Sequence, residues 1–302
     1  MKQLDMLKKA MKKKYIVPAF NFANFEILKG LLQASEELKC PMILQVSESA
    51  MNYFGDELLA GIISGLKKRK NISIHLDHGK NFDIIMRAIR LGFDSVMIDG
   101  STLSFTENVR LTKKVVDFAH KRKVMVEGEL GVLAMSEDDA TAQGITRFTD
   151  PDMAKEFVKK TGVDSLAISI GTNHGVNKYI STPEIRFDIL SEIERAIPNT
   201  PLVLHGASLV EEKYLDSINK FGGDIKKAIG NNNLLDNVHK TNICKVNMDT
   251  DFRLAYTSAV RQHMSERPAD YCPRTYGKSG IKEVKQCAID RILNICRIKK
   301  PR

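Results

Sequence analysis

The sequence predicts a closed (β/α)₈ barrel, in which eight parallel strands are each followed by a helix, and three observations lead to this prediction. The chain has 302 residues, whereas a barrel of this kind needs about 250. Eight apolar or β-branched runs recur along it, each followed by a segment of helical periodicity, as in a parallel sheet covered on its outer face. Nearly every run ends in polar residues, and in such a barrel all these ends meet at one mouth.

The expected elements follow one another along the whole chain. The strands are predicted at 16–22, 42–47, 72–79, 95–101, 124–131, 165–172, 202–208 and 244–250. The clearest helices between them are predicted at 25–38, 107–120, 152–160 and 251–265. No glycine-rich dinucleotide fingerprint follows the first strand, which argues against an open doubly wound sheet.

Two segments depart from the strand–helix repeat. Residues 132–149 are polar, acidic around Glu137 and Asp138, and too long for an ordinary connection, so we predict a lid over the mouth. Residues 268–302 are predicted to form a helical extension. Because no repeat or linker divides the chain, we predict a single domain over 1–302.

The composition limits the partners. Lys and Arg number 46 against 37 Asp and Glu, a net charge of +9. The excess lies in short runs without interleaved aromatics, so we predict a solvated basic surface and no nucleic acid. A positive field also suits a phosphorylated substrate. No stretch approaches the roughly 20 apolar residues of a membrane helix, and the five scattered cysteines indicate reduced thiols and a cytoplasmic location.

Three histidines, His78, His174 and His205, end three of the predicted strands. Imidazole suits Zn²⁺, and three histidines with an open fourth position are typical of a catalytic zinc site. Asp77 directly precedes His78 and would lie beside the metal, either to transfer a proton or to orient a histidine. The other histidines are interpreted as structural or surface residues, although His75 shares the strand face of Asp77.

Further polar residues surround these histidines in the predicted mouth. Asp99 and Glu129 offer oxygen ligands for a second metal, or hydrogen-bond acceptors. Glycines and a hydroxyl follow two histidines, at Gly175, Gly206 and Ser208. Exposed amides and hydroxyls of this kind hold phosphate, and Lys178, four residues after His174, would add a positive charge.

The motifs at the strand ends together resemble the class II fructose-bisphosphate aldolases, specifically the class IIB branch that includes tagatose-bisphosphate aldolases. They occur in the family's order over nearly the whole chain. The motifs are Pro18-Ala19-Phe20-Asn21, Gln45-Val46-Ser47, His75-Leu76-Asp77-His78-Gly79, Val96-Met97-Ile98-Asp99-Gly100-Ser101, Glu127-Gly128-Glu129-Leu130-Gly131, Gly171-Thr172-Asn173-His174-Gly175, Leu204-His205-Gly206-Ala207-Ser208 and Asn247-Met248-Asp249-Thr250-Asp251.

The resemblance implies a role for each matching residue. The three histidines would bind the catalytic Zn²⁺, and Asp77 would exchange a proton with the C4 hydroxyl of fructose 1,6-bisphosphate. Asp99 and Glu129 match a second, non-catalytic divalent metal position, and the family also implies a monovalent cation. The expected substrate contacts are Asn21, Ser47, Gly175, Lys178, Gly206, Ser208, Asn247, Asp249, Thr250 and Arg253.

The expected reaction is a reversible aldol cleavage. Zn²⁺ would polarise the C2 carbonyl and stabilise the enediolate, and Glu137 or Asp138 of the lid would then protonate C3. In the Asp-Thr-Asp-x-x-Arg form found here, Arg253 would reach the far phosphate of a neighbouring subunit, which implies a homodimer or homotetramer.

Two alternatives stay open. In the first, the substrate is tagatose 1,6-bisphosphate or another ketose bisphosphate. In the second, the chain is a non-catalytic sugar-phosphate-binding homologue. Asp249 favours fructose bisphosphate. Three departures from the family pattern bear on lid mobility and phosphate affinity: Leu209 follows Ser208, Asn177 precedes Lys178, and Ala134-Met135 replaces a glycine pair.

Overall fold

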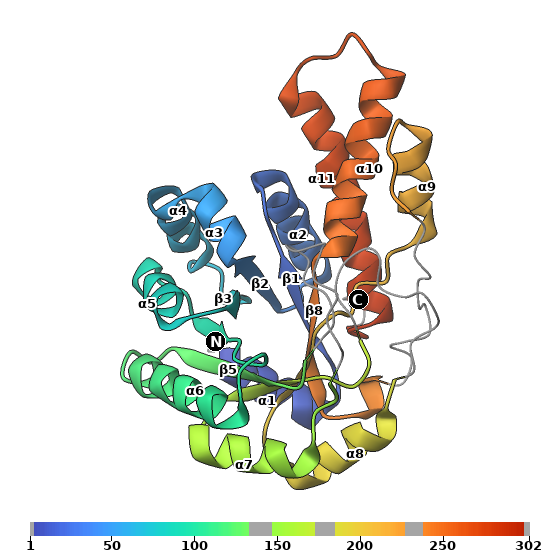
Figure 1. Ribbon diagram of the computed structural model, residues 1–302. Helices are drawn as coiled ribbons and strands as arrows, with labels where there is room; N and C mark the ends of the chain where they lie inside the picture. Colours follow the sequence, from blue (N-terminus) through green and yellow to red (C-terminus); the bar gives the residue numbers. More distant parts are fainter. Residues whose placement is uncertain (1–2, 133–146, 173–184, 227–237, 299–302) are drawn as a thin grey trace.

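Eight parallel strands close into a barrel in chain order, with β1 paired to β8, so the predicted fold class is confirmed (Figure 1). The computed structural model describes residues 3–132, 147–172, 185–226 and 238–298. The strands are β1 (Val17–Asn21), β2 (Met42–Ser47), β3 (Ile72–Gly79), β4 (Ser95–Ile98), β5 (Met125–Leu130), β6 (Ser165–Ile168), β7 (Leu202–Leu204) and β8 (Ile243–Met248).

Several strands end earlier than predicted. β4, β6 and β7 stop at Ile98, Ile168 and Leu204, three to four residues before the expected ends. The polar residues beyond these points leave the hydrogen-bonded ladder. They form the loops of the mouth, where side chains are free of the strict alternation that a strand imposes.

Helices cover the outside and the amino end of the barrel. They are α1 (Gln3–Lys13), α2 (Phe25–Leu38), α3 (Glu48–Phe54), α4 (Asp56–Leu66), α5 (Phe82–Leu91), α6 (Phe105–His120), α7 (Pro151–Thr161), α8 (Phe187–Ala196), α9 (Glu212–Lys220), η1 (Val238–Lys240), α10 (Thr250–Glu266) and α11 (Pro273–Asn294). Caps start several of them: Asn24, Asn81 and Asp150 accept backbone N–H groups, and Ser104 forms a capping box with Glu107. These caps satisfy donors that the first turn leaves free.

Helix α1 closes the amino end of the barrel, which the sequence analysis did not anticipate. Its lysines are exposed, as expected for a solvated basic run, but Met6, Leu7 and Ala10 are fully buried. They pack on the lowest interior layer, which includes Val17 and Cys244. An amphipathic stripe of three residues within one basic segment is short, so the charge pattern masked it.

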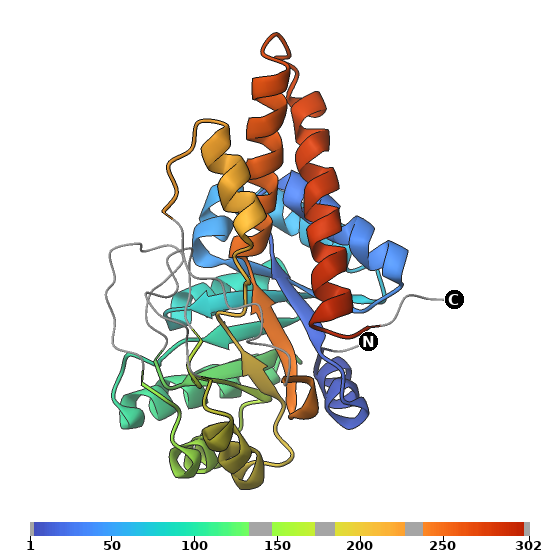
Figure 2. The same ribbon diagram turned by 90° about the vertical axis from the view of Figure 1, so that its right-hand side faces the viewer.

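The helix of the predicted C-terminal extension is α11, which pairs antiparallel with α10 and projects with it beyond the barrel wall (Figure 2). Helix α11 packs closely on α10 and α2, and two small residues permit the approach. A Cβ on Gly280 would meet the ring of Tyr256 at 2.4 Å, and one on Gly30 would meet Val284 at 2.8 Å. Within the described part of the chain, none of the helices combines the length and hydropathy that a membrane span requires.

The predicted lid is described only at its base. Val132 and Arg147 form an isolated antiparallel bridge, with both N–H···O distances at 2.9 Å. Thr149 then donates its hydroxyl to the carbonyl of Leu130 and receives the N–H of Ser169 at 2.8 Å. Both ends of the segment are thereby fixed to β5 and to the end of β6. Glu137 and Asp138 lie outside the described residues.

Candidate active site

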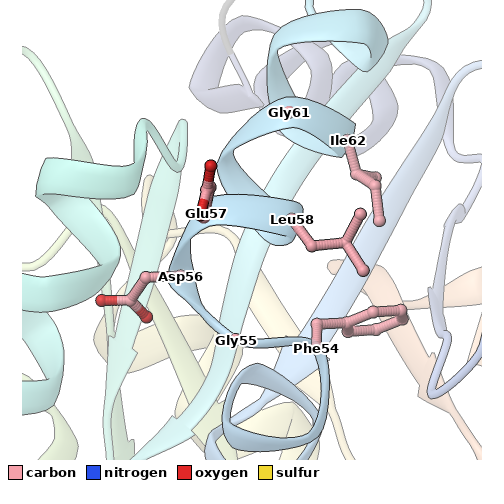
Figure 3. A pocket seen from close by; sticks show the side chains of 7 residues that line it. All are labelled: Phe54, Gly55, Asp56, Glu57, Leu58, Gly61 and Ile62. Carbon is pink, nitrogen blue, oxygen red and sulfur yellow. The ribbon is translucent and has the colours of Figure 1, made fainter.

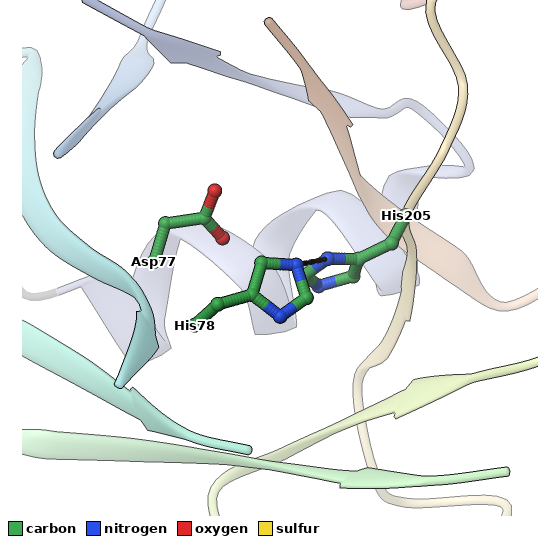
Figure 4. A group of neighbouring side chains, drawn as sticks. All are labelled: Asp77, His78 and His205. Atoms are coloured by element: carbon green, nitrogen blue, oxygen red, sulfur yellow. Dashed lines mark hydrogen bonds between the residues drawn. The ribbon is translucent and has the colours of Figure 1, made fainter. Parts of the chain in front are cut away.

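Strand β3 presents two consecutive residues, Asp77 and His78, to the barrel mouth (Figure 4). Successive residues of a regular strand point to opposite faces. Here the pairing with β4 shifts register between Leu76 and Gly79, and His78 has φ 47°. A non-glycine residue in this left-handed region is strained, and such strain is concentrated at functional sites. The irregularity places the carboxylate and the imidazole side by side.

Asp77 is buried, with 7% of its surface exposed, and amide groups hold both of its oxygens. Asn21 donates from Nδ2 to Oδ2 at 2.7 Å, and Asn247 donates from Nδ2 to Oδ1 at 3.1 Å. Gln45 in turn donates to Oδ1 of Asn21 at 2.9 Å, which fixes the orientation of that amide. Three neighbouring strands therefore set the position of one carboxylate.

Two carboxylates determine which ring nitrogens of His78 and His205 carry protons. Nδ1 of His78 lies 2.9 Å from Oδ2 of Asp99, and Nε2 of His205 lies 3.1 Å from Oε1 of Glu127. Ionised carboxylates only accept hydrogen bonds, so both of these nitrogens are the N–H donors. The remaining nitrogens, Nε2 of His78 and Nδ1 of His205, face each other at 2.9 Å.

The space at these two facing nitrogens favours a cation. Two lone pairs at 2.9 Å repel each other unless a proton or a metal ion lies between or beside them. Ligand atoms of Asp77, His78 and His205 lie within 4.8 Å of one another, as do those of His78, Asp99 and Glu129. Among the described residues, Oε2 of Glu129 is buried without a hydrogen-bond partner. Nitrogen and oxygen donors in this arrangement fit a divalent metal.

The pKa shifts of the cluster also favour a bound cation. Burial alone would lower the pKa of His78, but the negative charges of Asp77, Asp99 and Glu129 outweigh it and raise this pKa to about 10. Burial, together with the repulsion of Asp99, raises the pKa of Glu129 well above its usual range. Hydrogen bonds from His78 and Ser101 outweigh burial and lower the pKa of Asp99. The cluster thus has an excess of negative charge, which a metal cation would neutralise.

The loop after β7 and the start of α10 form another side of the mouth. Gly206 has φ 65°, which a residue without Cβ adopts readily. The Ser208 hydroxyl accepts the N–H of Asp249 at 3.3 Å. Thr250 begins α10, so the positive end of a helix dipole lies here. Arg253 pairs with Asp249 at 2.5 Å within the same chain.

Leu209, one of the departures from the family pattern, is anchored rather than loose. Its N–H donates to Oδ2 of Asp251 at 3.1 Å, and the N–H of Val210 donates to Oδ1 at 2.9 Å. Asp251 is fully buried and receives Nε of Arg291 at 2.8 Å. The loop that carries Gly206 and Ser208 is therefore tied to α10 and α11.

The structure brings most of the predicted site residues to one mouth. Those described there come from six strands or the loops after them: Asn21, Asp77, His78, Asp99, Glu129, His205, Gly206, Ser208, Asn247, Asp249 and Thr250. Ser47 has a local role, since its hydroxyl accepts the N–H of Ala50 at 3.3 Å and caps α3. His174, Gly175 and Lys178 lie outside the described residues, as do Asn177 and the pair Ala134-Met135.

The sequence analysis missed three buried polar residues below the mouth: His75 as a functional group, Glu127 and Lys245. Each is fully buried and precedes a residue of the mouth by two positions on its strand. That spacing, which places them on the interior face, was the available signal. Lys245 donates to Glu127 at 2.8 Å and to His75 at 3.2 Å. These contacts tie Lys245 to two other strands of the barrel interior.

A surface hollow elsewhere on the molecule does not contribute to this chemistry. It lies between the end of α3 and the start of α4, has a volume of about 760 Å³ and is lined by Phe54, Gly55, Asp56, Glu57, Leu58, Gly61 and Ile62 (Figure 3). Asp56 is paired with Arg87 at 2.6 Å, and the lining holds no histidine. The site is thus at the barrel mouth.

A parallel eight-stranded barrel with histidines and carboxylates gathered at the carboxyl ends of its strands is the architecture of a metal-dependent barrel enzyme. The comparisons with known proteins give the particular family. A sequence profile described as fructose-bisphosphate aldolase class-II matches residues 1–299. This chain belongs to that family.

Individual relatives are similar to this chain over most of their length. A fructose-bisphosphate aldolase of Treponema pallidum (strain Nichols) is 44% identical, covering 90% of this chain and 88% of its own. One of Giardia intestinalis is 42% identical, covering 95% and 90%. The crystal structure of the YdjI aldolase of Escherichia coli K12 superimposes with a TM-score of 0.75 at 29% identity, covering 97% of this chain and 96% of that one.

Proposed function

We propose that this protein catalyses the reversible cleavage of fructose 1,6-bisphosphate to dihydroxyacetone phosphate and glyceraldehyde 3-phosphate, with Zn²⁺ as the catalytic metal. The observation that carries the proposal is the pair of facing ring nitrogens of His78 and His205, 2.9 Å apart, directly beside Asp77. Family membership and the names of the curated relatives support the aldolase reaction and its substrate.

The residues that would hold the metal are His78, His205 and the predicted third ligand His174. A zinc ion there supplies a Lewis acid, which polarises the ketone carbonyl and stabilises the negative charge that cleavage leaves on the three-carbon fragment. A lysine nucleophile is not required for this route.

Asp77 is the residue placed to move the proton at the other end of the broken bond. Its carboxylate is held by Asn21 and Asn247 and lies next to His78, so it is proposed to reach the C4 hydroxyl of a sugar bound in the mouth. Asp77 accepts the proton of the C4 hydroxyl, and the C3–C4 electron pair stays with the dihydroxyacetone fragment. In the predicted lid, Glu137 or Asp138 then returns a proton to C3.

The phosphate-binding residues surround this centre. Gly206, Ser208 and the amino end of α10 at Thr250 offer amides and a hydroxyl to the phosphate of the dihydroxyacetone half, together with the predicted Gly175 and Lys178. Asn21 and Ser47 are proposed to face the rest of the sugar. Arg253, which pairs with Asp249, is proposed to bind the far phosphate across a homodimer or homotetramer interface.

Two further parts of the proposal concern ions and location. Asp99 and Glu129 lie with His78 in one ligand group and are proposed to form a second divalent metal position. A monovalent cation is proposed as well. A cytoplasmic location remains the prediction made from the spacing of the cysteines.

The test is cleavage of fructose 1,6-bisphosphate and, in parallel, of tagatose 1,6-bisphosphate, before chelation, after chelation and after restoring Zn²⁺. We expect cleavage of the fructose substrate that disappears with the chelator and returns with zinc. Zinc-dependent activity on the tagatose substrate alone would overturn the assignment of substrate but keep the metal. Binding of both sugars without turnover in the zinc-loaded protein would show a non-catalytic homologue.

A further inference from the structure

Below the metal ligands, the barrel interior holds charged and polar side chains where aliphatic ones usually fill such barrels. His75, Glu127 and Lys245 are all fully buried there. Burying ions costs several kcal/mol for each unless the surroundings compensate, so this layer needs an explanation beyond packing.

We infer that Glu127 is a positioning residue for the metal: it fixes the proton of His205 on Nε2 and turns Nδ1 of that ring toward the ion. Lys245 holds the Glu127 carboxylate in this orientation through the hydrogen bond at 2.8 Å. The inference rests on the proposed metal-dependent function and adds two residues to its machinery.

The two carboxylate oxygens of Glu127 have different partners, and one of them accepts from His205. Oε2 receives Lys245 at 2.8 Å and the hydroxyl of Ser165 at 3.3 Å. Oε1 receives Nε2 of His205 at 3.1 Å. A carboxylate between an ammonium group and an imidazole accepts from both, so the His205 proton cannot move to Nδ1 without losing this bond.

The ammonium group of Lys245 also starts a chain of hydrogen bonds toward the amino end of the barrel, in which each group donates to the next. An ammonium group has no acceptor, so Lys245 donates to Nε2 of His75 at 3.2 Å. Nδ1 of His75 then donates to Ser95 Oγ at 2.5 Å, and Ser95 donates to Oε1 of Gln3 at 2.8 Å. Burial and the charge of Lys245 lower the pKa of His75 well below its usual range, which keeps the ring neutral and able to accept.

The alternative state without Glu127 shows what this residue prevents. Nδ2 of Asn247 lies 3.2 Å from Nε2 of His205 and can donate to that nitrogen if it loses its proton. The proton would then sit on Nδ1 and bond directly to Nε2 of His78, which is 2.9 Å away. A proton would occupy the place of the metal. Glu127 favours the tautomer in which Nδ1 of His205 keeps its lone pair for the metal.

The test compares E127Q, K245M and the double variant E127L/K245M with the wild type, and S73A serves as the control. S73A removes a hydrogen bond to Gln3 in the same buried region but leaves His205 untouched. The zinc dissociation constant is measured by competition with a chromogenic chelator, and thermal unfolding is followed without metal. Selective ¹⁵N labelling of histidine reports the tautomer of His205.

We expect E127Q to weaken zinc binding roughly 10- to 100-fold, the usual effect of removing a partner of a metal-ligating histidine, and to shift the His205 proton toward Nδ1. K245M should lower the unfolding temperature of the metal-free protein, because it leaves a buried anion unpaired. The double variant should recover stability without recovering zinc affinity. S73A should bind zinc like the wild type.

The outcomes separate this inference from the proposed function. A wild-type protein that binds no zinc would overturn the proposed function itself. Tight zinc binding in both the wild type and folded E127Q would overturn only the role of Glu127. If E127Q fails to fold, the double variant carries the test, and wild-type affinity in that variant would show that the layer serves stability alone.

Discussion

At the residue scale, the site depends on departures from regular geometry. Asp77 and His78 share the mouth only because β3 breaks register and His78 takes φ 47°. Asp77 then receives one amide from β1 and another from β8. Two donors in a buried place fix the orientation of this carboxylate, as its proposed role as a general base requires.

Replacing Asp77 with Ala should abolish cleavage while zinc stays bound. Loss of a positioned general base costs roughly 10²- to 10⁴-fold in rate, and the histidine ligands remain in place. The measurements are kcat for fructose 1,6-bisphosphate and zinc per subunit by elemental analysis. D117N, at an exposed position of α6, is the control and should retain full activity. Loss of zinc from D77A would instead identify Asp77 as a metal ligand, and normal turnover would remove its role as a base.

At the element scale, the loop after β7 is held in place by helices that lie outside the barrel. Val210 has φ 53°, an unfavourable conformation for a β-branched residue. Asp251 of α10 accepts the N–H groups of Leu209 and Val210 and binds Arg291 of α11. Helix α10 therefore stabilises the loop that carries Ser208, and α11, the helix of the predicted C-terminal extension, supports it by holding Asp251.

Replacing Asp251 with Asn should both destabilise the protein and weaken phosphate binding. Removing one partner of a buried ion pair costs about 3 to 5 kcal/mol, and because Asn keeps only one side-chain oxygen, one of the two loop amides would lose its acceptor. Urea unfolding should show the loss of stability, and KM for the substrate should rise more than kcat falls. The exposed pair of Asp188 with Arg186 offers the control D188N, which should change neither. An unchanged KM in D251N would separate the loop from phosphate binding.

The sequence carried enough information for the barrel and for most of the mouth, because strand ends such as His205 and Asn247 follow hydrophobic runs of regular spacing. It did not predict the buried layer of polar side chains below the mouth. Glu127 lies inside a recognisable motif, yet only the closed barrel brings it to Lys245, 118 positions away. Nor did the basic segment of α1 reveal its buried side. Contacts between distant strands and the choice of a tautomer are properties of the folded chain.

At the scale of the whole molecule, the metal, protonation and stability are coupled. Asp77, Asp99 and Glu129 lie close to His78, and without a metal their negative charge is offset by a proton on that ring, whose pKa is raised to about 10. The zinc-loaded protein would replace this proton with the ion, so metal binding releases a proton and strengthens as pH rises. Metal binding and protonation of this site both depend on folding, because the unfolded chain brings none of these groups together.

The metal-free protein should therefore lose stability as pH rises from 7 to 9, whereas the zinc-loaded protein should not. The folded-state pKa of His78 lies above its ordinary value of 6.5, so its stabilising effect is complete below pH 6.5 and is lost as pH rises toward 10. Glu129, whose pKa is also raised, acts in the same direction. One proton corresponds to at most about 1.4 kcal/mol per pH unit. Thermal unfolding with and without zinc measures the difference.

The variant H78N supplies the control for this pH dependence. Its metal-free form lacks the titrating ring, so its unfolding temperature should fall less steeply between pH 7 and 9 than that of the wild type. The gap between zinc-loaded and metal-free wild type should widen over the same interval, by a few degrees for each kcal/mol. Equal slopes in metal-free wild type and H78N would assign the effect to other groups. A constant gap would show that zinc displaces no proton from the site.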